Sequence, residues 1–503
     1  MHSYKGVNYL KGAQFFAFNI ITISKKEMPI NYIANILVKG PENTAGWQYI
    51  RKFVPPILLV SLLKLYFNGS SNTWQRDLHG KVYIITGGTS GIGSALVREL
   101  AARGAQLVIL TSQLENDNSG AVWTTDYVDD LREATRNPLI YVEQCDLSSL
   151  YSVRKFATKW LDNRAPRRLD GIICLASERV PPGKQREASA EGVEKQIAVN
   201  YLGHYHLLTL LIPAIKSQPI DRDVRIVLST CSTQALGAVD SNDPLWENKL
   251  YPSGSPWKVY GSSKLMLHMF AKEFQRRLDS EHEKKKNASD VVNRIRVNVV
   301  NPGIVRTPSL RRFISFGSIF GILLYLILYP IYWVLFKSSE AGMQSFVFAL
   351  SCPNLVDIEG GQYIRECKLV ENKLRKELED KELQKELYEN TAKKILELEK
   401  TSAIERNRGK NKARKDKKSK KAKTKVVDKK LRKKGISDAE RSRLFKSAFN
   451  DSKDVYPDIK QKDLTNEQEA ARNSELKRLD EKYEAAQKKA TANKNNTEEK
   501  KVV

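Results

Sequence analysis

Cysteine and histidine are scarce in this chain, which limits the kinds of site that it can build. The 503 residues include six histidines and five cysteines, an odd number with no CxxC pair. Neither a disulfide framework nor a zinc site is predicted, and no metal is expected. A reducing, cytosol-facing compartment fits this composition. The cysteines are Cys145, Cys174, Cys231, Cys352 and Cys367.

The first 26 residues lack the features of a targeting leader. They carry four Lys, no Arg and no acidic residue, with apolar stretches such as "FFAFNIITI". A mitochondrial presequence would be rich in Arg, and a secretory signal has one apolar region followed by a small-residue cleavage site, neither of which is identifiable here. Met28 is an equally good start for translation as Met1.

Only one apolar run is long enough to cross a bilayer. Residues 313–336 contain no charged side chain over 24 positions, and about 20 apolar helical residues span the hydrocarbon core. An earlier run, Phe53–Leu63, has eleven residues with Pro55 and Pro56 near its start. It is too short to span, so it predicts a shallow amphipathic anchor, with packing on the following domain as the alternative.

Basic charge is concentrated near the C-terminus. Residues 406–434 hold 17 Lys and Arg against two Asp, so this window supplies +15 of the net +26. It predicts contact with anionic lipid head groups or RNA phosphates, against the alternative of a solvated tail. The preceding residues 371–405 have Glu–Lys pairs four apart and Leu at helical spacing, which predicts a charged surface helix or coiled coil. Residues 406–503 are predicted to be largely disordered.

Strands alternate with helices from residue 79 to residue 370. β-branched runs at 82–85 and 106–110 flank a helix expected over 94–102, and the alternation continues to "RIRVNVVNPG". This order predicts an α/β fold, a Rossmann-type doubly wound parallel sheet covered on both faces. Residues 1–78 form a separate N-terminal region with the short anchor. Polar loops of insertion type are expected at 113–136, 233–257 and 279–291.

A glycine-rich stretch, "TGGTSGIG", separates the first strand from the first helix. Thr86, Gly87, Gly91 and Gly93 lie here. Glycines let the backbone approach a pyrophosphate, whose charge the free N–H groups of a helix start attract. After the third strand, "DLSS" places Asp146 where its carboxylate can accept a hydrogen bond from an adenine amino group. A purely structural glycine turn is the alternative.

Further along, "YGSSK" places Tyr260 and Lys264 one helical turn apart. A lysine close to the phenol favours the phenolate and lowers its pKa. Such a tyrosine can pass a proton to or from a carbonyl oxygen.

This order of motifs resembles the short-chain dehydrogenase/reductase superfamily from about Lys81 to Arg365, and within it the membrane-associated retinol-dehydrogenase-like group and fungal membrane-anchored relatives. The resemblance implies a nicotinamide-dependent oxidoreductase in which Tyr260 and Lys264 are catalytic and Asn200 relays protons. It also implies a set of cofactor contacts: Thr86, Gly87, Gly91, Ile92, Gly93, Ser112, Asp146, Asn200, Tyr260, Lys264, Pro302, Gly303 and Thr307.

Three stretches depart from the family pattern. The family's "NNAG" is replaced by "CLAS" at residues 174–177, so hydrogen bonds from its two amides must come from elsewhere. In "STCST" an ungapped alignment puts Cys231 at the catalytic serine position. A shift of one residue puts Ser232 there, which we favour because a hydroxyl is the better donor to an oxyanion. Thr111 and Ser112 replace the usual ribose-binding acid, which favours NADP(H) over NAD(H).

The family's last strand, here Gln362–Ile364, must pair with the strand that ends at Val300. Residues 313–336 lie between the two, so a single membrane crossing would separate the strands. The apolar segment is therefore expected to enter and leave on one side, with Pro330 as a break point. A lid that dips into the membrane is favoured over a buried helix of the substrate pocket.

These expectations combine into one functional hypothesis. The enzyme interconverts a carbonyl and an alcohol on a lipid-like substrate such as a retinoid, a sterol or a long-chain compound. It is membrane-associated with the catalytic domain facing the cytosol, at the endoplasmic reticulum or a lipid droplet, with the mitochondrial outer membrane and the vacuole as alternatives. A homodimer stays open. The alternative function is a cofactor-binding scaffold with weak or no catalysis whose basic tail recruits anionic lipid or RNA.

Overall fold

The computed structural model describes most of the chain between the two ends. The residues that it describes are 37–38, 40, 47–112, 118–162, 165–219, 221–240, 243–247, 249–285, 294–370 and 375–433. The expectations for residues 1–26, for Met28 and for the tail beyond residue 433 lie outside this set. Contacts divide the chain into one unit ending at Ile404 and a second that begins at Glu405.

One eight-stranded sheet forms the centre of the first unit, with the order β3-β2-β1-β4-β5-β6-β7-β8. All neighbouring pairs are parallel except β7 with β8. The Rossmann-type parallel sheet is therefore confirmed. The strands are β1 (Val82–Thr86), β2 (Gln106–Thr111), β3 (Ile140–Gln144), β4 (Gly171–Cys174), β5 (Val224–Ser229), β6 (Ile295–Asn301), β7 (Tyr363–Arg365) and β8 (Lys368–Leu369).

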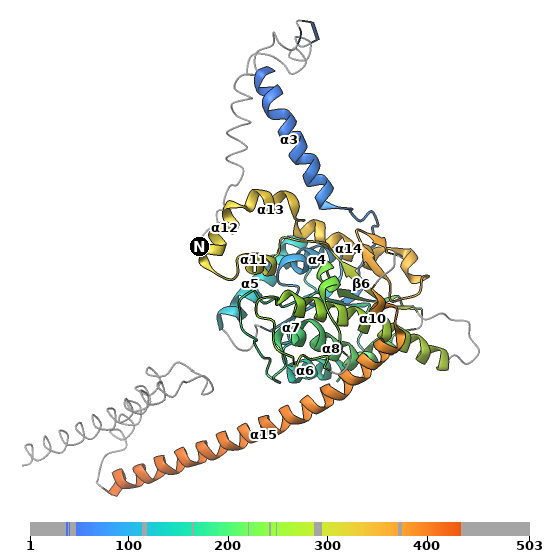
Figure 1. Cartoon of the computed structure of the whole chain (residues 1–503). Helices are drawn as coiled ribbons and strands as arrows, with labels where there is room; N and C mark the ends of the chain where they lie inside the picture. The colour runs from blue at the N-terminus through green and yellow to red at the C-terminus, as the bar shows by residue number, and fades with distance from the viewer. Residues whose placement is uncertain are drawn as a thin grey trace, which may run out of the picture. The chain divides into compact units, whose positions relative to one another are not determined.

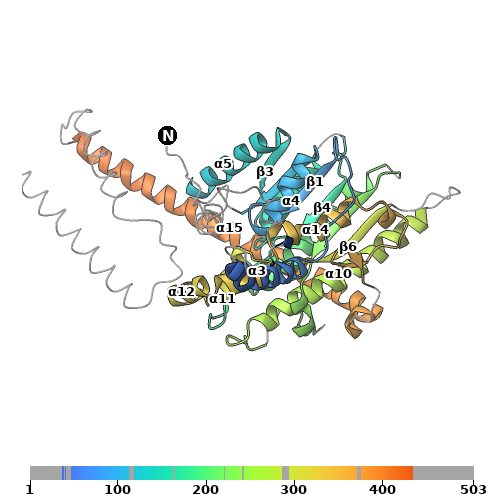
Figure 2. The same cartoon turned by 90° about the horizontal axis from the view of Figure 1, so that it is seen from above.

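Helices cover both faces of the sheet (Figures 1 and 2). One hydrophobic cluster joins the sheet to α6 (Leu150–Leu161), α8 (Gly203–Leu210) and α10 (Trp257–Lys285). The other joins it to α4 (Gly91–Ala102), α5 (Asn118–Thr135) and α14 (Ser339–Ser351). Shorter helical segments connect these elements: α7 (Lys195–Ile197), a π-helical turn (Ala198–Leu202), α9 (Ile212–Lys216) and the 3₁₀ turns Ser232–Leu236, Pro353–Val356 and Lys376–Leu378.

Two of the expected polar loops contain α-helix, and the third, 233–257, begins within the 3₁₀ turn Ser232–Leu236. The interval 113–136 contains α5, and α10 extends through residue 285 into the interval 279–291. The prediction failed for α5 because only a narrow side of this helix is apolar. Val128 and Leu131, three residues apart, are buried against the sheet while most of the remaining described side chains face solvent.

The strand pairing required of the closing strand is confirmed, since Val300 of β6 lies beside Ile364 of β7. The apolar insert, residues 313–336, therefore leaves and returns on one side of the sheet. Its neck is closed by backbone hydrogen bonds, from the Lys337 N–H to the Ile304 carbonyl over 2.9 Å and from the Arg306 N–H to the Lys337 carbonyl over 3.0 Å.

The insert and the turn before it form three short helices, α11 (Pro308–Ile314), α12 (Ile319–Ile327) and α13 (Tyr329–Leu335). In the described part of the chain no single helix is long and apolar enough to span a membrane. The bent pair α11–α12, with 106° between its axes, meets that test of length and composition. Of the three helices only α12 buries a residue, Tyr325. The alternative of a buried pocket helix is therefore wrong.

The short N-terminal run belongs to a longer helix, α3 (Trp47–Asn68), which contains both prolines and buries none of its residues. It lies beside the apolar insert. The Lys64 ammonium donates to the Phe336 carbonyl over 2.9 Å and lies 5.3 Å from the centre of the Trp333 ring. Helix α3 thus contacts the segment of α13, which directly follows α12. We call the exposed apolar side chains of these three helices the apolar platform.

The charged helix is longer than expected. Helix α15 runs from Lys381 to Lys433, so helical structure continues past residue 405 through the lysine-rich window. Within the first unit, its leucine stripe packs on the sheet domain, where Leu387 and Ile395 are buried. The Tyr201 hydroxyl bonds Thr391 over 2.8 Å, and the Tyr205 hydroxyl donates to the Tyr388 carbonyl over 2.9 Å.

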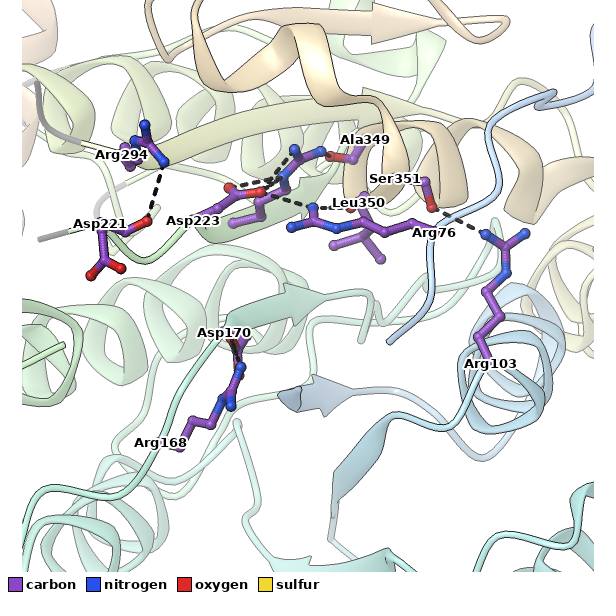
Figure 3. A network of polar contacts seen from close by, with 11 residues as sticks. Arg76, Arg103, Arg168, Asp170, Asp221, Asp223, Arg294, Ala349, Leu350 and Ser351 are labelled. Carbon is purple, nitrogen blue, oxygen red and sulfur yellow. Dashed lines mark hydrogen bonds and ion pairs between the residues drawn. The ribbon is translucent and has the colours of Figure 1, made fainter. Parts of the chain in front are cut away.

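A network of ion pairs ties the amino ends of the strands together (Figure 3). Asp223, directly before β5, pairs with Arg225 over 2.9 Å and with Arg76 over 2.8 Å. Arg76 lies in the linker after α3 and also donates to the Leu350 carbonyl. Asp170, directly before β4, pairs with Arg168 over 2.7 Å. These contacts lie at the amino ends of the strands. Those of Arg76 fix the linker to the sheet domain.

Candidate active site

The candidate site lies at the carboxyl ends of the strands. The strand order reverses between β1 and β4, and such a reversal leaves a crevice outside the carboxyl ends of a doubly wound sheet. The loops after β1, β4, β5 and β6 bring most of the expected residues to this crevice. The loop after β4, residues 175–180, is called the β4 loop below.

The glycine turn after β1 packs directly against the β4 loop. Gly87 has a φ of +68°, and a Cβ on it would come within 2.7 Å of the Ala176 nitrogen. A Cβ on Gly93 would lie 2.0 Å from the Gly87 carbonyl oxygen. Thr86 is buried, and its hydroxyl accepts from the N–H groups of Leu175 and Ala176, both over 3.1 Å. The turn is therefore held close to β4 with room for glycine alone.

The start of α4 fits the pyrophosphate of a dinucleotide. Its N-cap residue, Ser90, makes no side-chain cap hydrogen bond, so the first N–H groups of the helix are open to an anion. Gly91, with a φ of +57°, faces Thr307: a Cβ there would be 3.1 Å from the threonine methyl. The Thr307 hydroxyl caps α11 by accepting from the Leu310 N–H over 3.2 Å. Ile92 is half-buried beside α14.

The remaining expected cofactor contacts border the same crevice. Asp146 follows β3, and its carboxylate accepts from the Ser148 N–H over 2.9 Å and from the Ser148 hydroxyl over 2.7 Å. Ser112 is exposed at the end of β2, and the residues that follow it, 113–117, lie outside the described residues. Pro302 and Gly303 follow β6, where the Gly303 N–H donates to the Asn301 side chain over 2.9 Å.

Helix α10 presents Tyr260 and Lys264 to the crevice. Both are buried, and the Lys264 ammonium lies 5.8 Å from the centre of the tyrosine ring and donates to the Ser229 carbonyl over 3.1 Å. Burial lowers the pKa of Lys264 to about 8. Burial also raises the pKa of Tyr260, and charge at Cys231 acts in the same direction. The tyrosine is therefore the protonated partner near neutral pH.

The structure places Cys231, and not Ser232, toward Tyr260 and Lys264. Cys231 interacts electrostatically with both, and its thiol contacts the Thr233 hydroxyl at 2.7 Å. Ser232 is exposed, and its hydroxyl accepts from the Asn301 amide over 3.3 Å. The chain turns into a 3₁₀ segment at Ser232, and this side chain contacts Asn301 of β6, whereas the electrostatic contacts of Tyr260 and Lys264 are with Cys231.

Asn200 lies in the π-helical turn and is fully buried. Its amide oxygen accepts from the Glu178 N–H over 2.7 Å, and its amide nitrogen donates to the Glu178 carbonyl over 2.9 Å. The same nitrogen donates to the Ser263 hydroxyl over 3.1 Å. With these three bonds the side chain clamps the β4 loop. Together with Thr86, it holds the backbone of the loop in which the "CLAS" stretch ends.

Two residues that the sequence analysis left out lie against Tyr260. The Ser177 hydroxyl is 3.2 Å from the tyrosine hydroxyl. The Arg179 guanidinium stacks over the tyrosine ring, 4.3 Å from its centre, and lies 5.5 Å from the centre of the Phe313 ring. The only signal for them was that "CLASERV" departs from the family pattern. Buried His204, whose ring lies 3.0 Å from the Thr86 hydroxyl, was also missed; burial lowers its pKa to about 3.

Comparisons with known proteins agree with this geometry. A family model described as short chain dehydrogenase matches residues 81–241. An uncharacterized oxidoreductase from Saccharomyces cerevisiae is 44% identical over 77% of this chain and 100% of its own length. Human retinol dehydrogenase 13 is 29% identical over 66% of this chain and 90% of its own length. Mouse polyprenol dehydrogenase is 31% identical over 57% of this chain and 76% of its own length.

Proposed function

This chain belongs to the short-chain dehydrogenase/reductase superfamily, in its retinol-dehydrogenase-like group, and we propose that it interconverts a carbonyl and an alcohol on a hydrophobic, lipid-like substrate at a membrane. The relatives named above for retinol and polyprenol act on apolar alcohols by their names. The proposal takes the same substrate class for this chain.

One observation carries the proposal: a single side chain separates the candidate catalytic tyrosine from the apolar insert. Arg179 stacks between the Tyr260 ring and Phe313, the first residue of the insert. Phe313 also contacts Trp257 at the start of α10, with ring centres 6.5 Å apart. A lipid that leaves the membrane along the insert therefore reaches Tyr260 beside aromatic side chains, without passing through bulk water.

Each residue of the site has a separate proposed role in the reaction. The Tyr260 hydroxyl gives its proton to the substrate oxygen during reduction and takes it back during oxidation. Lys264 carries positive charge below its pKa of about 8 and favours the phenolate that remains. Gly87, Gly91 and the start of α4 would hold a nicotinamide dinucleotide, which supplies or accepts the hydride when bound. The missing carboxylate at Ser112 favours NADP(H) as this cofactor.

The apolar platform is the proposed contact with the membrane. Its most exposed side chains on α12 are Phe320, 85% exposed, and Ile319, 77% exposed. Aromatic and basic residues suited to the interface flank them, including Trp333 and Arg311. The proposed location is the cytosolic face of the endoplasmic reticulum or a lipid droplet. The lysine-rich window of residues 406–434 would add attraction to anionic head groups, about 1 kcal/mol for each basic residue near the surface.

The test is turnover by the purified full chain in mixed micelles. NADPH and NADH oxidation is followed with a series of aldehydes and ketones of increasing chain length. We expect kcat/KM to rise with chain length and Tyr260→Phe to lower kcat on the order of 1000-fold. Tyr141→Phe, a half-exposed tyrosine on β3, is the matched control and should keep full activity. If cofactor binds and no carbonyl compound is reduced by the wild type, the scaffold alternative replaces this proposal.

A further inference from the structure

The β4 loop brings two side chains to Tyr260 that the family pattern does not contain. Ser177 stands at the last position of "CLAS", and Arg179 follows two residues later. One contacts the hydroxyl of Tyr260 and the other covers the face of its ring. The Ser232 hydroxyl, which was expected at this place, bonds Asn301 instead. The Lys264 ammonium still borders the tyrosine ring, 5.8 Å from its centre, while it donates to the Ser229 carbonyl.

The loop that carries these two side chains is fixed from three directions. Thr86 holds its first two N–H groups, and Asn200 holds both backbone groups of Glu178, the residue between Ser177 and Arg179. From α11, Arg312 donates to the Arg179 carbonyl over 2.8 Å and pairs with the Glu178 carboxylate. Because the backbone is held on both sides of Glu178, the side chains on either side of it are preorganised against the tyrosine.

Charge at Arg179 acts on the tyrosine. Burial alone would lower the pKa of Arg179, but Tyr260 and Cys231 beside it raise that pKa, so the guanidinium stays charged. Its charge and the hydrogen bond from Ser177 both oppose the rise that burial imposes on the pKa of Tyr260. Among the described residues no carboxylate pairs with Arg179. Its charge is therefore available to the phenolate that forms when Tyr260 gives up its proton.

We propose that Ser177 supplies the catalytic hydroxyl of this site and that Arg179 stabilises the tyrosine phenolate together with Lys264. In the reducing direction a hydride, which a nicotinamide dinucleotide would supply when bound, adds to the carbonyl carbon, and the π electron pair moves to the oxygen. The O–H bond of Tyr260 breaks, its proton forms an O–H bond with that oxygen, and the negative charge left on the phenol faces the guanidinium. Ser177 donates to the same substrate oxygen as charge builds on it. The inference rests on the proposed function. It assigns the catalytic hydroxyl to the loop after β4, in place of the loop after β5.

Turnover tests the role of Ser177. Ser177→Ala is expected to lower kcat about 100-fold, the usual loss for one donor to an oxyanion. Adding Cys231→Ser to that variant returns a hydroxyl to the neighbouring loop. The kcat of the double variant should be at least tenfold higher than that of Ser177→Ala alone. Full activity of Ser177→Ala, in an enzyme whose wild type turns over, would overturn the assignment of the hydroxyl.

The titration of the phenol tests Arg179 without any substrate. The difference in phenolate absorbance between the wild type and Tyr260→Phe gives the midpoint of Tyr260 directly, so the result stands even if the proposed function fails. We expect Arg179→Gln to raise this midpoint by about one pH unit, and Arg179→Lys to restore most of it. Arg186→Gln, which removes a cation bonded to the exposed Gly192 carbonyl, is the matched control and should leave the midpoint in place. An unchanged midpoint in Arg179→Gln would overturn the role of the guanidinium.

Discussion

Helix α12 and the first turns of α15 show opposite relations between composition and burial. The sequence of α12, "IFGILLYLI", is apolar, yet Leu326 is 59% exposed and Phe320 is 85% exposed. The first turns of α15 are rich in Lys and Glu, yet Leu387 is fully buried and Ile395 is 5% exposed. An apolar helix thus lies outside the fold, and a charged helix contributes to the core.

The difference teaches that burial depends on the partner surface that a segment meets. Helix α15 offers one narrow stripe, and the tyrosines of α8 and its preceding turn accept it with ring contacts and hydrogen bonds, such as the pair Tyr205 and Tyr388 with ring centres 5.0 Å apart. Helix α12 is apolar all round, so any protein surface leaves most of it uncovered. A continuous apolar patch of this kind marks a contact with a membrane or a partner.

The largest effect is expected from removing the docked turns of α15. A chain ending at Asp380 loses Leu387, Ile395 and the partners of two tyrosine hydroxyls, which leaves buried polar groups unpaired. We expect the free energy of unfolding to fall by about 5 kcal/mol or more, comparable to the whole stability of a domain. A chain ending at Ile404 should keep its denaturation midpoint in urea, since the first unit ends there.

Where the short chain fails to fold, Leu387→Ala in the full chain is measured instead, with an expected loss of about 3 kcal/mol. Leu396→Ala, at a side chain 56% exposed on the same helix, is the control and should change stability by less than about 0.5 kcal/mol. Equal stability of the two alanine variants would mean that α15 does not dock as described.

A smaller effect, on membrane binding alone, is expected from α12. The triple variant Leu323→Ser, Leu326→Ser and Ile327→Ser replaces side chains that are 53%, 59% and 75% exposed. Flotation with vesicles should show affinity reduced about 1000-fold or more, since burying each such side chain in hydrocarbon contributes roughly 1.5 to 3 kcal/mol and each 1.4 kcal/mol is about tenfold. The thermal midpoint should hardly move. Leu250→Ser, at a side chain 96% exposed elsewhere, is the control, and unchanged flotation of the triple variant would refute membrane contact through α12.

The smallest effect is expected at Glu399, which joins α15 to Arg154 and His206 through ionic contacts. Burial acts to raise the pKa of Glu399, but its contact with His206 and its hydrogen bonds from Arg154 lower it to about 2. A depressed carboxylate stabilises the fold above its ordinary pKa, and that stabilisation is lost as pH falls from about 4.5 toward 2. With solvent screening it amounts to about 1 kcal/mol. Glu399→Gln should flatten the decline of stability in this window, and an identical acid profile would contradict the contact.

Much of the fold could be predicted from sequence because it rests on local patterns. The β-branched runs, the glycine turn after β1 and the YxxxK spacing each depend on neighbouring residues, and the structure has strands, a turn and a helix there. The direction of the Ser232 side chain could not be predicted, since one residue of shift in a 3₁₀ turn reverses it. The contacts of Arg179 join the β4 loop to α10 and α11, and no spacing along the chain encodes them.

The helical structure of α5, in a segment predicted to be a loop, was missed for a related reason. Among its described residues α5 buries only two apolar side chains, Val128 and Leu131, together with Thr124, and two apolar positions give a weak periodic signal. The docking of α15 likewise needed knowledge of the surface formed by α8 and α10. What the sequence could supply for α15 was the helix itself and its leucine stripe.

The hydrogen-bonded neck at Ile304, Arg306 and Lys337 makes the apolar insert a self-contained module. Its two ends stay side by side whatever lies between them, so residues could be added, removed or exchanged there while the register of β6 with β7 is kept. Helix composition in this segment can then follow the thickness and chemistry of its surroundings, while the reaction centre a few residues away keeps its own geometry.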